Sequence, residues 1–230
     1  MKQNSIFIFQ LFELDKTSVD MHYARHLSKD EKLKKLIKQH GPVKLEKKKN
    51  LCLYLCYSIM SQQLSVKVAK VIRQRFLDLY GSNEPTPQQI VDTPFEKLRG
   101  IGLSNAKVNY IQNVARFEIE KGMSHQKLSK LNNEEVIEYL TVIKGVGRWT
   151  TEMLLMFALG REDVFAIDDL GLQQAVAGLY DLKHRKKKIM LSKILKIAEQ
   201  WSPYRTYACM YMWRWKDNPP ITSGKKEKKK

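Results

Sequence analysis

The chain has 230 residues, 43% of them hydrophobic, and its 41 Lys and Arg against 24 Asp and Glu give a formal net charge of +17. An excess of this size favours a polyanionic partner, either nucleic acid or an anionic membrane. The membrane is the weaker alternative because no segment approaches the roughly 18 consecutive apolar residues of a spanning helix. The 3 cysteines are too few for a disulfide framework and indicate a reducing compartment.

Helical periodicity dominates the chain, with short polar breaks between the helices. Residues 6–11 form the only alternating, strand-like pattern, and the fold of residues 1–27 is left open. Ser28-Lys-Asp-Glu31 is a capping-box pattern that predicts a helix through Lys38. The apolar run Leu51–Met60, which contains Cys52 and Cys56, indicates a central core helix. Further helices are expected at residues 66–80, 105–120, 134–142, 148–159, 170–180, 186–200 and 206–216.

A glycine turn at residues 98–107 lies between two of these helices. Free backbone amides at a helix N-terminus bind anions, so the turn is a candidate phosphate site. Its expected members are Gly102, Ser104 and Lys107. A plain N-cap at Ser104 explains the same residues without a ligand.

The stretch Ile143–Thr150 repeats this arrangement with two glycines. Gly145 is expected to end one helix in the left-handed conformation, and Gly147 to let the next helix begin at once. The unpaired amides, the helix dipole and the flanking cationic side chains favour a backbone phosphate here. A simple helix–helix corner is the alternative. The predicted phosphate contacts are Lys144, Gly145, Val146, Gly147 and Arg148.

Two carboxylates follow the helix that begins at this turn. That helix is apolar almost all round and is therefore expected to be buried. Asp168 and Asp169 stand just before the helix at residues 170–180. Both residues could be helix caps, and either could be a functional acid beside the phosphate site.

At this point the chain resembles a known family, the helix-hairpin-helix (HhH-GPD) DNA glycosylases, and within it the DNA-3-methyladenine glycosylase II branch. The matching segments are Ile143–Thr150, the run Asp163–Asp169, and Trp201–Ala208 with Trp213. The resemblance extends over about residues 51–217.

The resemblance implies an all-α fold with two lobes and an active site in the cleft between them. The expected domains are a helical bundle at residues 51–160, which contains the hairpin, and a second lobe made of residues 1–50 and 161–218, which carries the catalytic acid. Residues 219–230, rich in lysine, are expected to be a disordered basic tail.

The resemblance also implies a reaction, the hydrolysis of the N-glycosidic bond of a flipped alkylated purine such as 3-methyladenine or 7-methylguanine in base excision repair. Asp169 would stabilise the cationic sugar. Trp149, Met153 and Trp213 would line the base pocket, and Gln63 would fill the gap left in the DNA stack. A solvated loop is the alternative for Gln63. Met153 and Arg214 stand where some relatives carry aromatic residues, which leaves the range of accepted bases open.

Bifunctional relatives carry a Schiff-base lysine at the hairpin position that Trp149 occupies, so no lyase activity is expected. The alternatives are a noncatalytic helix-hairpin-helix DNA-binding protein and a glycosylase for another base lesion. The expected partner is double-stranded DNA with alkylated bases, the expected state is a monomer, and the expected location is intracellular, in a bacterial cytoplasm or a nucleus. No cofactor or metal is expected, although the resemblance leaves open a monovalent cation at the hairpin.

Overall fold

The computed structural model describes residues 21–183 and 186–218, and every regular element in these ranges is an α-helix, which confirms the expected all-α fold. No helix among them combines the length and the apolar character that a membrane span requires. The helices are α2 (His22–Leu27), α3 (Glu31–His40), α4 (Leu51–Ser61), α5 (Val66–Asp78), α6 (Pro87–Asp92), α7 (Phe95–Gly100), α8 (Asn105–Glu120), α9 (His125–Leu128), α10 (Asn133–Thr141), α11 (Arg148–Phe157), α12 (Leu170–Leu179), α13 (Lys187–Glu199) and α14 (Arg205–Asp217).

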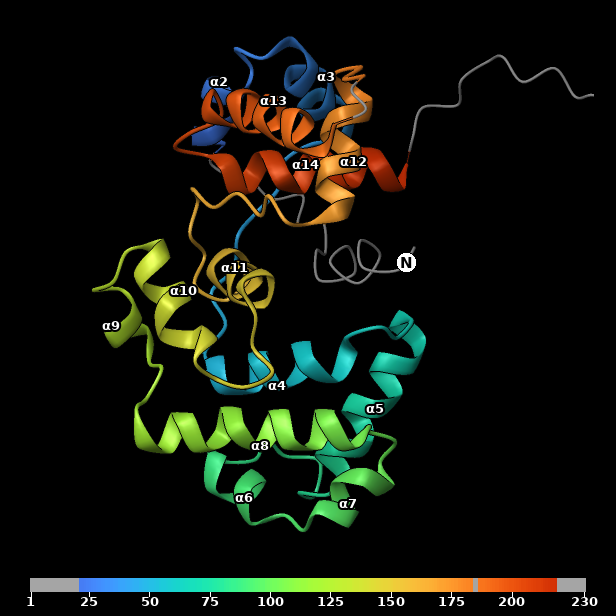
Figure 1. Ribbon diagram of the computed structural model, residues 1–230, viewed down its shortest axis with the longest axis vertical. Helices are drawn as coiled ribbons and strands as arrows, with labels where there is room; N and C mark the ends of the chain where they lie inside the picture. Colours follow the sequence, from blue (N-terminus) through green and yellow to red (C-terminus); the bar gives the residue numbers. More distant parts are fainter. Residues whose placement is uncertain (1–20, 184–185, 219–230) are drawn as a thin grey trace, which may run out of the picture.

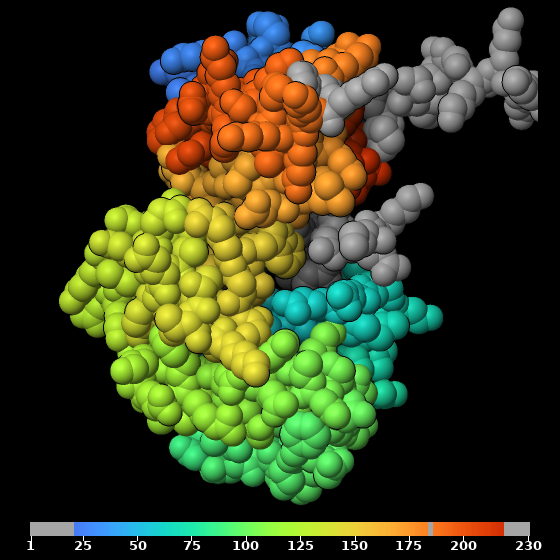
Figure 2. Space-filling view, viewed as in Figure 1, coloured from blue at the N-terminus to red at the C-terminus, as the bar shows by residue number. Residues whose placement is uncertain are grey.

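The helices form two groups that meet at α11 and the linker that follows it (Figure 1). One group contains α4 to α11, in which α8 packs against both α4 and α6. The other contains α2 and α3 together with α12, α13 and α14, so helices from the two ends of the described chain pack together. Figure 2 shows the two groups as two bodies in contact. The helix α12 begins on the side of its group that faces α11.

The helix α4 is the centre of the first group, as its apolar sequence predicts. Asn50 caps its start by accepting the amide of Leu53, and Leu55, Cys56 and Ile59 are fully buried. The Cys56 thiol also contacts the carbonyl of Ile111 on α8 at 3.8 Å. The apolar residues of α4 therefore fix the position of α8, whose N-terminal turn follows the first glycine turn.

Some helix ends differ from the sequence predictions. The N-cap of α3 is Asp30 and not Ser28, because the Asp30 carboxylate accepts hydrogen bonds from the amides of both Lys32 and Leu33. The short helices α2 and α9, of 6 and 4 residues, have too little periodicity to be predicted. The strand-like pattern at residues 6–11 and the basic tail at residues 219–230 lie outside the described residues.

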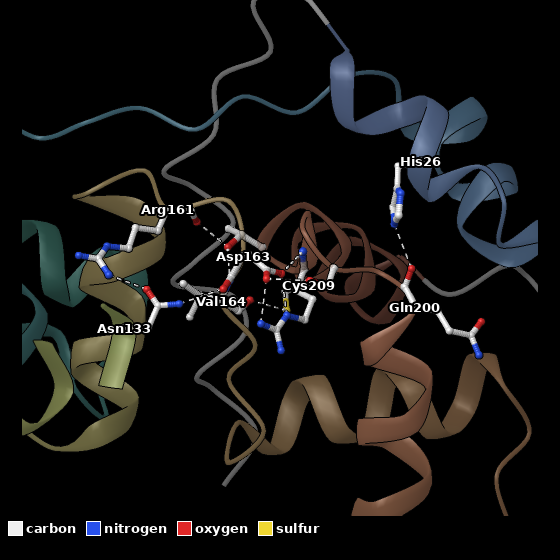
Figure 3. A network of polar contacts seen from close by, with 10 residues as sticks. His26, Asn133, Arg161, Asp163, Val164, Gln200 and Cys209 are labelled. Carbon is white, nitrogen blue, oxygen red and sulfur yellow. Dashed lines mark hydrogen bonds and ion pairs between the residues drawn. The ribbon is translucent and has the colours of Figure 1, made fainter. Parts of the chain in front are cut away.

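The linker between α11 and α12 is hydrogen-bonded to both helix groups (Figure 3). Arg161 donates to Asn133 of α10 at 2.7 Å, and Asn133 in turn donates to the carbonyl of Asp163 at 3.0 Å. The Asp163 carboxylate accepts from Arg205 of α14 at 2.6 and 2.9 Å. Since neighbouring linker residues are fastened to opposite groups, the linker fixes the start of α12 relative to the hairpin before α11.

Candidate functional site

The turn between α10 and α11 requires one of its glycines for conformation and packing. Gly145 has a φ of 108°, in the region that favours glycine, and a Cβ there would lie 2.3 Å from Cγ of Tyr110. Gly147 is the N-cap of α11 with a φ of −99°, and the space where its Cβ would be is open. In the described part of the chain, the amides of Gly147 and Arg148 donate to no backbone acceptor. An anion can approach these amides directly.

The turn between α7 and α8 follows nearly the same course. Gly102 has a φ of 104°, and the next residue, Leu103, is buried. Val146 is buried in the same way in the turn between α10 and α11, residues 143–150, which is called the main hairpin below. The difference lies at the N-cap, where the Ser104 hydroxyl accepts the amide of Lys107 at 3.3 Å. Ser104 therefore occupies one amide of the α8 N-terminus, whereas Gly147 has no side chain that could occupy an amide of α11, so the α11 N-terminus offers one more amide to an anion.

The cationic residues of the main hairpin differ in their partners. Lys144 is exposed, and its ammonium has no partner among the described residues. Arg148 was also predicted to contact a phosphate, but its guanidinium donates to both oxygens of Glu134 at 2.8 and 2.5 Å and to Glu152 at 3.1 Å. The bonds to Glu134 raise the pKa of Arg148 and lower the pKa of Glu134. Within the described ranges, the positive charge of this turn without a carboxylate partner is therefore that of Lys144.

Asp169 is buried, with 4% of its surface exposed, at the N-terminus of α12. Its Oδ1 accepts the amide of Leu172 at 2.6 Å and the indole N–H of Trp213 at 3.0 Å. Among the described residues, the one donor to its Oδ2 is the indole N–H of Trp149, at 2.9 Å. Asp169 is thus a helix cap, one of the two roles that the sequence left open, and Oδ2 still has capacity for a further contact. Asp168 beside it is exposed.

The three residues expected to line the base pocket are near the acid, but two of them are buried. Trp213 is 1% exposed, packs against Phe157, and uses its indole N–H to hold Asp169. Met153 is 4% exposed. Only Trp149, at the start of α11, retains partly exposed surface. In this conformation Trp149 can contact a base, whereas Trp213 orients the carboxylate.

Glu152 is a buried carboxylate that the sequence reasoning missed. It is 1% exposed, its Oε1 accepts from Arg148, and its Oε2 has no hydrogen-bond partner in the described part of the chain. Burial raises the pKa of Glu152 to about 7, against the attraction of Arg148, and the negative charges of Asp168 and Glu134 act in the same direction as burial. The spacing of four residues from Arg148 was the signal in the sequence that could have identified the pair.

The raised pKa of Glu152 predicts a pH-dependent stability difference. Between pH 4.5 and about 7 the folded protein holds a proton that the unfolded chain releases, so this residue lowers the free energy of unfolding as pH rises. Glu152→Gln keeps an acceptor for Arg148 but removes the carboxyl group that titrates. Its effect on the free energy of unfolding should therefore be more favourable at pH 8 than at pH 5, by about 1–3 kcal/mol. Urea unfolding of both proteins at the two pH values measures this difference. An equal effect at pH 5 and pH 8 contradicts it.

The loop after α4 holds Gln63 in an unusual conformation. Gln63 is exposed and has a φ of 60°, in the left-handed region that residues other than glycine rarely adopt. Lys107, expected to contact a phosphate, instead donates from Nζ to the carbonyls of Met60 and Gln62 at 2.9 and 2.7 Å. Burial lowers the pKa of Lys107.

Among the described residues, no three His, Cys, Asp or Glu side chains form a group that could hold a metal ion.

The all-helical fold and the two glycine turns define a helix-hairpin-helix protein. The family model of the HhH-GPD superfamily base excision DNA repair proteins matches residues 56–200, more than half of the chain, and the chain belongs to this superfamily.

Individual relatives agree with this assignment. The chain is 36% identical over 201 residues to DNA-3-methyladenine glycosylase 1 of Schizosaccharomyces pombe, and the match covers 86% of each protein. It is similar to the solved structure of the S. pombe 3-methyladenine DNA glycosylase Mag1 in complex with abasic DNA, with a TM-score of 0.75 and 35% identity over 90% of this chain and 100% of the other. A DNA-3-methyladenine glycosidase from Bacillus halodurans gives a TM-score of 0.75 and 35% identity, covering 88% of this chain and 93% of that one. The expected superfamily and branch are confirmed.

Proposed function

We propose that the protein is a monofunctional DNA glycosylase that removes alkylated purines, such as 3-methyladenine and 7-methylguanine, from double-stranded DNA inside the cell. The observation that carries this proposal is the environment of Asp169. Two indole N–H groups and the start of α12 hold its carboxylate in one orientation beside the exposed part of Trp149. A helix cap alone needs only the bond to Leu172, so the two tryptophans indicate a further role.

The main hairpin would bind one phosphate of the DNA backbone. Its free amides at Gly147 and Arg148 point from the N-terminus of α11, and Lys144 supplies the charge. Because Trp149 follows in the first turn of α11 and reaches Asp169, a strand held at the hairpin would pass close to the acid. The net charge of +17 supports the approach to a polyanion without reading its sequence. One copy of the chain contains all of these residues, so we propose a monomeric enzyme.

In the reaction, the bond between C1′ of the sugar and the base nitrogen breaks, and the base leaves with the electron pair. The sugar passes through a cation-like state, which an anionic carboxylate at Asp169 stabilises. Oδ2 of Asp169, which has a single partner among the described residues, can also orient the water whose oxygen bonds to C1′ and whose proton is released. An alkylated purine already carries a positive charge and leaves as a neutral base, so the proposed reaction needs no general acid and no cofactor. A cationic base on the face of Trp149 gains about 0.5–2 kcal/mol over a neutral one.

The test of this function is the release of free bases from methylated duplex DNA by the purified protein. We expect 3-methyladenine and 7-methylguanine among the products under single-turnover conditions. Release of an oxidised or mismatched base alone would assign another lesion. Tight DNA binding without release of any base would indicate a noncatalytic DNA-binding protein.

The proposal also predicts that the protein does not cut the DNA strand. Trp149 occupies the hairpin position at which bifunctional relatives use a lysine, and it cannot form a Schiff base. Incubation with methylated DNA and borohydride should therefore give no covalent complex, while base release continues. Covalent capture in proportion to turnover contradicts this prediction. A bifunctional glycosylase on a substrate that it accepts is the positive control for trapping.

A further inference from the structure

The loop between α4 and α5, residues 62–65, is held by a lysine from another helix. Lys107 lies in the first turn of α8, and its Nζ donates to the carbonyls of Met60 and Gln62 at 2.9 and 2.7 Å. The carbonyls at a helix C-terminus lack partners within the helix and carry a partial negative charge, so an ammonium is well placed there. Lys107 therefore fastens the end of α4 and the first residue of the loop to α8.

Gln63 follows the second of these carbonyls. Its left-handed backbone, with a φ of 60°, is unfavourable for a residue with a Cβ and persists only where the surroundings hold it. The amide of Leu64 donates to the carbonyl of Ser61 at 3.1 Å, so the chain is fixed on both sides of Gln63. The side chain itself is exposed at the tip of the loop. A strained backbone that presents an exposed side chain is typical of a functional position.

We propose that Lys107 is a positioning residue for Gln63 and not a phosphate contact. By holding the carbonyls of Met60 and Gln62, it keeps Gln63 in the orientation in which its side chain enters the DNA stack and stops the flipped nucleotide from returning. This inference rests on the proposed function. It links the first turn of α8 to base flipping, because the two hydrogen bonds of Lys107 join that turn to the loop.

Two other roles are open to Lys107, and each has its own experimental signature. A phosphate contact contributes about 0.9 to the slope of log affinity against log salt, and its loss lowers that slope. A lysine that only caps α4 contributes to stability, and its loss acts independently of Gln63. A positioning residue acts through Gln63, so its loss has no further effect once the Gln63 side chain is gone.

The experiment is a double-mutant cycle with Lys107→Met, Gln63→Ala and the double variant, read by the fluorescence of 2-aminopurine next to a lesion and by the single-turnover rate of 7-methylguanine release. We expect Lys107→Met to lower both the flipping signal and the rate about tenfold, and to change nothing in the Gln63→Ala background. Lys107→Arg, which keeps the charge and the donors, should retain the rate. Lys97→Met, which removes one exposed charge from α7, should leave the flipping signal unchanged.

Independent, additive losses in the cycle would overturn the proposal. The proposal would also be overturned if Lys107→Met lowered the slope of log affinity against log salt as much as Lys144→Ala does. The thermal midpoint of each variant is measured first, and all assays are done well below the lowest midpoint. If Lys107→Met does not fold, Lys107→Gln, which keeps one donor, takes its place in the cycle. If the wild-type protein flips sites marked with 2-aminopurine but releases no base, the proposed function is contradicted. The double-mutant cycle read by 2-aminopurine fluorescence then still tests the role of Lys107.

Discussion

Asp169→Asn should reduce the single-turnover rate of base release by at least about 10²–10³-fold while DNA binding persists. Asn is as good a helix N-cap as Asp, so α12 should keep its start. The lost features are the negative charge and one acceptor, since the amide nitrogen of Asn cannot accept from an indole N–H. Affinity for DNA should be equal or higher because a negative charge near the phosphates is removed. Rapid-quench base release and fluorescence anisotropy measure the two quantities.

The matched control is Asp168→Asn. Asp168 has the same chemistry one residue earlier in the chain, but it is exposed and Asp169 alone is held by the two tryptophans. Its replacement should change the rate no more than about twofold, as expected for a surface substitution. Equal losses in the two variants, or full activity of Asp169→Asn, would remove the catalytic role from Asp169 and favour a protein that binds DNA without acting on it.

Gly145→Ala should destabilise the protein by about 2–4 kcal/mol, from a strained backbone and from overpacking against Tyr110. The nearest atoms to the added Cβ are Cγ and Cβ of Tyr110, at 2.3 and 2.5 Å, and these lie too close to the backbone to move aside easily. The hairpin must therefore open. Urea unfolding measures the loss of stability, and DNA affinity should fall with it.

Gly147→Ala is the companion variant with the opposite expectation. Its φ is suitable for any residue, and the space for the methyl group is open, so the protein should lose less than about 1 kcal/mol of stability. The methyl group would nevertheless stand where a phosphate approaches the amides of α11, and DNA affinity should fall about tenfold or more. Wild-type affinity in this folded variant would show that no phosphate approaches the hairpin at Gly147.

Local sequence signals predicted the elements that carry the site. The glycines and the apolar periodicity placed α8 at residues 105–120 as the structure has it, and α11 and α12 to within two residues. The position of Asp169 directly before an apolar helix predicted its place at a helix start. These features depend on short stretches of chain, where capping chemistry and periodicity decide the outcome.

The partners of the side chains could not be predicted in the same way, because they come from distant segments. The sequence does not show that Arg148 pairs with Glu134, because only the fold brings the two side chains together. Lys107 stands in a phosphate-binding pattern, yet its ammonium reaches carbonyls about 45 residues earlier in the chain. Trp213 was placed near the base through family resemblance, and its burial against Phe157 depends on how α14 packs. Charge and residue type indicated the site, whereas tertiary packing determined which groups are free.

The hydrogen bonds along the linker connect the two helix groups on either side of the site. Thr206 adds to them, since its buried hydroxyl donates to the carbonyl of Arg161 and accepts the amide of Val164. In the proposed function, a duplex that must reach both the hairpin and Asp169 would therefore bend, while the two helix groups keep their arrangement. Smooth bending of a site costs about 1–6 kcal/mol in intact DNA and less where damage has weakened stacking. The elasticity of the duplex would then act as a first filter, favouring damaged steps before any base is inspected.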